Sequence, residues 1–161
     1  SAKRHGLFKE ILIKQKNVDI ISGRQTLLSL SSNRWSTRED NCAVLLATLP
    51  ITVSTLEKIV SDPSFDRETA GDAMSLLKAI DFEFCLCLSV MSDLLQLCNI
   101  LSKTLQKQDL NISVATSQIK CLIKKIQDLR TSTDNENAWL KAHSIADIIG
   151  VEYQEPRQRK V

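Results

Sequence analysis

The stretch FEFCLCLSVMSDLLQLCNIL, residues 82–101, predicts the centre of the fold, because it is apolar around most of a helix. It has about the length of a membrane span, but polar side chains such as Glu83 and Asp93 interrupt it. Its apolar residues form two stripes, Phe84, Leu88, Met91, Leu95 and Cys98, and Val90, Leu94, Leu97 and Leu101. A thin polar strip accompanies them: Ser89, Asp93, Gln96, Asn99 and Lys103. We therefore expect a buried core helix here rather than a span.

The next helix, about residues 109–130, has the most regular pattern in the chain. Its apolar residues are spaced 3-4-3-4-3, a seam of almost three heptads: Ile112, Ala115, Ile119, Leu122, Ile126 and Leu129. Such a seam packs against another helix, either inside this domain or in a second chain. Because the chain already contains another long apolar helix, we expect internal packing between these two.

Shorter patterns predict helices on both sides of this pair. In residues 2–17 four apolar side chains share one side: Leu7, Phe8, Ile11 and Leu12. A capping-box pattern starts a helix at Ser36, and Pro50 either kinks that helix or begins a new one that reaches about Val60. Asp66 is the expected N-cap of a further helix, which could continue into the apolar stretch.

A last helix is expected from about residue 136 to residue 149, with Gly150 as its stop. Four of its side chains are expected to be buried: Trp139, Leu140, Ile145 and Ile148. The sequence thus predicts an all-α helical bundle with two long central antiparallel helices. We divide it into a lead-in helix and connector (1–35), the bundle (36–150) and a flexible basic tail (151–161). The first residue is Ser1 rather than Met, so we expect a piece of a longer polypeptide.

Composition restricts the chemistry that we expect. The chain is 43% hydrophobic and 25% charged, which is typical of a globular domain, and its net charge of +2 gives no strong overall field for nucleic acid. Its five cysteines include no C-x-x-C pair, and neither histidine has a partner at ligand spacing, so no metal site is expected. Motifs for phosphate loops, nucleophile elbows and zinc proteases are absent from the sequence, so we expect no catalytic residues in this chain.

The segment LSSNRWSTREDN, residues 30–41, places one of only two tryptophans between arginines. An aromatic plane beside guanidinium groups suits stacking on an unpaired nucleic-acid base, but it equally suits a residue that pins the connector onto the bundle. The residues we select as candidates for nucleic-acid binding are Lys3, Arg4, Arg34, Trp35 and Arg38. The lysines of residues 103–125 are read as a solvated helix face, with DNA contact as the lesser alternative.

Three segments together resemble the C-terminal region of hAT-superfamily transposases and their domesticated relatives. They are KRHGLFKEI (3–11), LSLSSNRWSTREDN (28–41) and LLQLCNILSKTLQKQDLNISVATSQIKCLIKKIQDLRT (94–131). The motifs are similar to those of zinc finger MYM-type proteins and of the THAP-finger repressor of the protein-kinase inhibitor. The helical motif of that family is matched by Leu101, Ser102, Leu105, Gln106, Asn111, Ile112, Ala115 and Ile119, with Trp139 a few residues beyond.

The resemblance implies an RNase H-like core interrupted by a helical insertion, and this chain is similar to the insertion. It implies a nuclear parent protein that is an active or inactive DNA transposase, in which three acidic residues bind divalent Mg or Mn. None of the three acidic residues can be assigned in this chain. We therefore expect the fragment itself to need no cofactor and not to be an enzyme. In the family the Arg-Trp motif, here Arg34 and Trp35, lies near the flipped base at the cut end. We therefore expect a contribution to DNA binding and assembly, with a protein-interaction or dimerisation module as the alternative. We expect neither a membrane nor a small-molecule substrate as a partner.

Overall fold

The computed structural model describes residues 2–14, 35–107, 111–128 and 134–153, without the side chains of residues 35–37, 134 and 135. All regular structure in these ranges is helical, which confirms the all-α class. The helices are α1 (Ala2–Lys14), α2 (Trp35–Ser61), α3 (Arg67–Ala79), α4 (Phe82–Leu105), α5 (Ile112–Asp128) and α6 (Asp134–Ile149).

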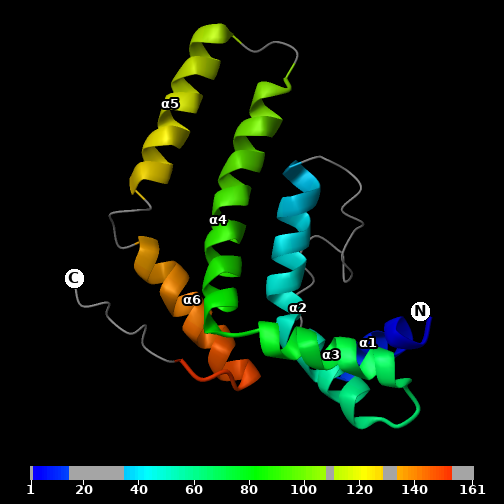
Figure 1. Ribbon diagram of the computed structural model, residues 1–161. Coiled ribbons are helices and arrows are strands. Elements are labelled where there is room, and N and C mark those ends of the chain that lie inside the picture. Colours follow the sequence, from blue (N-terminus) through cyan, green and yellow to red (C-terminus); the bar gives the residue numbers. More distant parts are fainter. Residues whose placement is uncertain (1, 15–34, 108–110, 129–133, 154–161) are drawn as a thin grey trace.

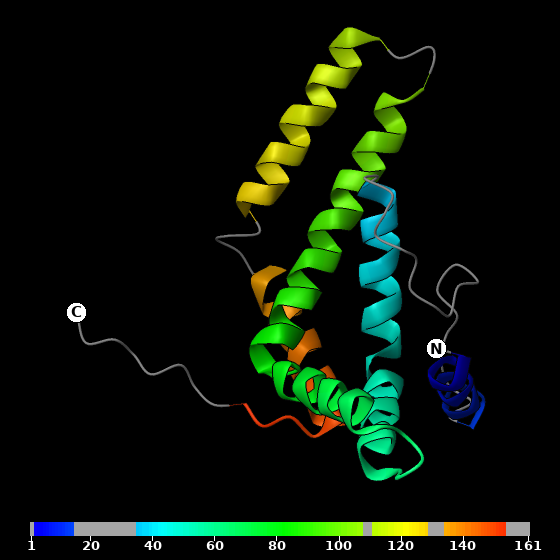
Figure 2. The same ribbon diagram turned by 45° about the vertical axis from the view of Figure 1, so that its right-hand side comes forward.

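Helix α4 is the central element of the bundle, as its apolar circumference predicts (Figure 1). It packs mainly against α2 on one side and α6 on the other, and both neighbours run antiparallel to it. Helix α5 also runs antiparallel to α4 but contacts only its last turns, where the hairpin that they form extends beyond the start of α2 (Figures 1 and 2). The core is therefore formed by α2, α4 and α6 rather than by α4 and α5.

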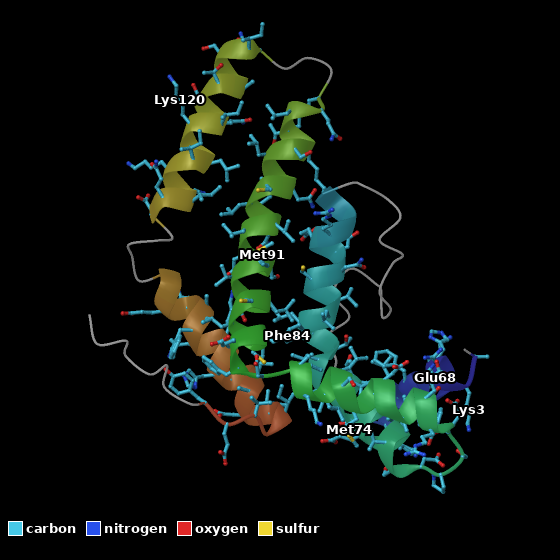
Figure 3. All side chains as sticks on the ribbon, in the orientation of Figure 1. Lys3, Glu68, Met74, Phe84, Met91 and Lys120 are labelled. Atoms are coloured by element: carbon cyan, nitrogen blue, oxygen red, sulfur yellow. The ribbon has the colours of Figure 1, made fainter. Side chains whose placement is uncertain are left out.

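The polar strip of α4 contributes two buried side chains. Ser89 is fully buried, and its hydroxyl donates to the carbonyl of Cys85 at 2.9 Å. Asn99 is 6% exposed, and its Nδ2 donates to Glu39 Oε2 on α2 at 2.9 Å. These polar groups tolerate burial because each has a hydrogen-bond partner. Met91, from the first apolar stripe and labelled on α4 in Figure 3, is instead 46% exposed.

Two described helices, α2 and α4, also have the length and hydropathy of a membrane span. The core helix of a folded domain has the same two properties, so this observation does not separate a span from a bundle. In the fold both helices bury part of their surface against each other and against α6.

Helix α6 packs against α4 through alanines, which corrects the expected set of buried residues. Ala138, Ala142 and Ala146 are buried, whereas Leu140 and Ile148 are 63% and 65% exposed. The alanines recur every four residues on one face, and their small size lets the two helix backbones approach closely. Leu140 and Ile148 lie off this face, because the contact with α4 fixes which side of α6 is covered.

An aromatic cluster joins α6 to the start of α4 and to the segment after α6. Its rings, whose centroids lie 4.5–5.2 Å apart, belong to Phe82, Trp139, His143 and Tyr153. Trp139 is half-buried there, as expected for this helix. Gly150 has φ of +71°, the left-handed conformation that ends a helix, so the predicted stop is confirmed.

Aspartate caps decide where α3 and α4 begin. Asp66 accepts a hydrogen bond from the Thr69 N–H at 2.7 Å, which confirms the predicted N-cap of α3. Asp81 accepts one from the Phe84 N–H at 2.8 Å and starts α4 separately. The expectation that α3 could continue into the apolar stretch is therefore wrong. By contrast, α2 continues through Pro50 as one helix.

Helix α1 packs on α2 with the side that the sequence predicts. Its four apolar residues, Leu7, Phe8, Ile11 and Leu12, are all half-buried. Glu10 adds an ion pair to Lys58 of α2 at 3.9 Å. The hydrogen bond and charge of Lys14, 2.7 Å away on α1, lower the pKa of Glu10.

Candidate functional site

The Arg-Trp motif leads into α2. Trp35 is the first residue of the helix, its side chain is outside the described atoms, and Arg34 is outside the described residues. Arg38 follows in the first turn and is exposed. Asn99 in the C-terminal half of α4 donates a hydrogen bond to Glu39, and this bond attaches the first turns of α2 to α4. The structure thus places the backbone of Trp35 at the start of α2, next to α4, and base stacking by its side chain stays a prediction.

The other two candidate residues lie at the opposite end of α2. Lys3 Nζ donates to the carbonyl and Oγ of Ser64 at 2.5 and 3.0 Å, and lies 4.1 Å from the ring centre of Phe65 (Figure 3). Both partners belong to the loop after α2. Helix α2 has 27 residues and is therefore about 40 Å long. Arg4, next to Lys3, is exposed. Lys3 and Arg38 are therefore not brought together on one surface.

Helix α5 exposes the seam that we expected to be internal. None of its described residues is buried, Ile112 is 83% exposed and Ile119 is 41% exposed. Leu122 and Ile126 are half-buried, so the expectation of internal packing holds for part of the seam only. The reason is geometric: the hairpin extends past α2, so among the described helices α5 packs mainly against α4 (Figure 1).

We call the exposed apolar side chains of the hairpin the hairpin surface; on α5, Ile112, Ile119 and Ile123 share one side of the helix, and Val114 lies on another. The members of the hairpin surface, each between 37% and 83% exposed, are Ile100, Leu105, Ile112, Val114, Ile119 and Ile123. Val114 and Ile123 lie outside the heptad positions and were therefore missed by the sequence pattern. Exposed apolar side chains that share one side of a helix mark interaction sites more often than single exposed residues do.

A hollow of about 200 Å³ lies between α4 and α5 next to this surface. Leu97 and Leu101 line it on α4, and Leu122 and Lys125 line it on α5. Gln118 also lines it, and its Oε1 is shielded from solvent without a hydrogen-bond partner among the described atoms. An unpaired buried carbonyl destabilises its surroundings by about 1–3 kcal/mol. The contact between α4 and α5 thus contains both a hollow and an unpaired polar atom.

Positive charge is concentrated in the same hairpin. Residues 94–128 contain five lysines and two aspartates, a net charge of +3, whereas the whole chain has +2, so the remainder has −1. The lysines Lys103, Lys107, Lys120, Lys124 and Lys125 are all exposed. Figure 3 shows Lys120 at the outer edge of α5. The overall composition conceals this local field.

A larger hollow, of about 410 Å³, lies between α1, α2 and α3. Arg4, His5 and Phe8 line it on α1, and threonines line it on α2. The hydroxyls of Thr48, Thr52 and Thr55 each donate to the carbonyl four residues earlier, at 2.7, 3.0 and 2.7 Å. These donors are therefore already used, and the α2 wall offers mainly methyl groups and aliphatic side chains.

No three His, Cys, Asp or Glu side chains in the described ranges come together as a metal site. Comparison with known proteins adds no assignment: no protein-family model matches the sequence, and no solved structure matches the fold.

Proposed function

We propose that this chain is the helical insertion region of a hAT transposase-like nuclear protein, and that it works there as an interaction module. The resemblance of the three sequence segments supports the first half. The observation that carries the second half is the hairpin surface, where α5 leaves its apolar side chains exposed. In this proposal the chain itself catalyses no reaction and holds no cofactor.

The hairpin surface gains hydrophobic free energy when another polypeptide covers it. Full burial of an isoleucine side chain contributes roughly 1.5–3 kcal/mol. Ile112, Ile119 and Ile123 are each between 41% and 83% exposed, so each retains a substantial part of that gain. Few residues need to contribute in this way, because a handful of buried side chains dominates most interfaces.

A position-specific cross-link tests this proposal. A photoreactive amino acid replaces Ile123 in the full chain expressed in cells, and the matched control replaces exposed Asp72 on α3. We expect a discrete adduct from position 123, identified by mass spectrometry, that disappears with Ile119→Asp while the helical circular dichroism is retained. An identical adduct pattern from both positions, or unfolding of Ile119→Asp, would show that the hairpin surface is ordinary core.

The lysines of the hairpin favour DNA contact as a second candidate function. Lysine side chains on one surface bind phosphates without reading sequence. An electrophoretic mobility shift with hairpin DNA should weaken for Lys120→Glu with Lys124→Glu, and also for Trp35→Ala if the tryptophan stacks on a base. Equal binding by wild type and both variants would count against a DNA role for this chain.

A further inference from the structure

The hairpin surface combines three properties that restrict its partner. Its residues on α4 and α5 are apolar and exposed, Ile100 also lines the hollow between these helices together with Lys125, and the hairpin carries five exposed lysines. Between residues 94 and 107, and between 111 and 127, the chain contains no aspartate or glutamate. The surface therefore presents apolar contacts framed by one sign of charge.

The shape of the hairpin favours a helix as the occupant. Two antiparallel helices leave a groove along their line of contact, and side chains of a third helix fit into such a groove. Helix α5 has 17 residues and a length of about 26 Å, enough to contact several turns of a docked helix. Lys125 lines the hollow itself, so an occupant brings its polar edge close to that ammonium group.

The charge of the hairpin disfavours a second copy of the chain. Two hairpins facing each other would oppose a net +3 with a net +3, whereas an acidic helix would pair with the lysines. We propose that the groove between α4 and α5 binds an acidic amphipathic helix of another protein. The inference rests on the proposed interaction function and names the chemistry of its partner.

Fluorescence polarisation with two designed peptides tests the inference on the full chain. The first is a labelled helix of about 20 residues with leucines at helical spacing and glutamates on its polar face. The second is identical except that lysines replace the glutamates. We expect the acidic peptide to bind at least about tenfold more tightly, with an affinity that falls as salt screens the charges.

Matched variants separate apolar from charged contributions. Ile100→Asp should weaken binding of the acidic peptide about tenfold or more, and Lys125→Glu about tenfold with a smaller salt dependence, because both side chains line the hollow. Leu140→Asp on α6 and Lys78→Glu on α3 change exposed residues outside the hairpin and should leave binding unchanged. Circular dichroism of each variant confirms that its fold is retained.

Duplex DNA of random sequence and phosphatidylserine vesicles serve as the other anionic probes. Tighter binding of either one than of the acidic peptide would overturn the inference in favour of that class of partner. Equal binding of both peptides would overturn the role of charge, and failure of both would overturn the inference as a whole. A specific adduct at position 123 would still support the proposed interaction function in that case, so the two failures are distinguishable.

Discussion

The hydrogen bond from Asn99 to Glu39 supports a direct prediction about stability. Asn99 is 6% exposed, its partner is a half-buried carboxylate, and the Nδ2–Oε2 distance is 2.9 Å. Hydrogen bonds to charged groups contribute about 1.5–3 kcal/mol, and Asn99→Ala also leaves the carboxylate without this donor. For a chain of this size, 1 kcal/mol corresponds to about 2–4 °C in Tm, so we expect Tm to fall by about 3–12 °C.

Far-UV circular dichroism during thermal and urea unfolding measures this loss. Gln96→Ala is the matched control, because Gln96 is an exposed amide on the same helix and should change the free energy of unfolding by no more than about 0.5 kcal/mol. A double-mutant cycle with Glu39→Ala should show that the two losses are not additive. Equal effects of Asn99→Ala and Gln96→Ala, or strictly additive losses, would refute the reasoning that this bond anchors α2 on α4.

Four further predictions follow from packing and protonation. Ala142→Leu should cost about 1–3 kcal/mol by overpacking the α4–α6 contact, whereas Leu140→Ala should cost less than about 0.5 kcal/mol; denaturant midpoints compare them. Gln118→Leu should raise Tm, because it removes the unpaired Oε1; a lower Tm would mean that the oxygen has a partner. Hydrogen bonds from the Thr69 N–H and hydroxyl lower the pKa of Asp66 from 3.8. The stabilising effect of Asp66 is therefore present above pH 3.8 and is lost as the pH falls through the lower pKa of the folded state. Thermal unfolding of Asp66→Asn should accordingly depend less on acid pH than that of the wild type. Burial raises the pKa of the Cys85 thiol above 9.0, so Cys85 should react with a thiol reagent far more slowly than the exposed cysteines, as peptide mass mapping would show.

Local signals in the sequence were sufficient for the elements themselves. The aspartate cap of α3, the stop at Gly150 and the apolar side of α1 depend on residues within one or two turns, so pattern reading located them correctly. The central position of α4 could also be predicted, because a helix that is apolar around most of its circumference needs neighbours on more than one side.

The packing of α6 and the roles of the candidate residues could not be predicted as well from the sequence. The alanine face of α6 gave no signal, because alanine is also common on exposed helix surfaces. The larger Leu140 and Ile148 were therefore predicted to be buried in place of the alanines. The roles of Arg34 and Trp35 remain predictions of the resemblance.

A regular heptad pattern states that a helix has an apolar face, but it carries no information on whether anything in the same chain is positioned to cover it. Whether the apolar face of α5 is covered depends on how far the hairpin extends beyond α2. That distance is set by the packing of segments that are far apart in the sequence. The helices and their apolar faces were thus encoded locally in the chain. The exposure of Ile119 and Ile123 and the hollow between α4 and α5 arose only when α4, α2 and α6 formed the core and left α4 as the main neighbour of α5 among the described helices.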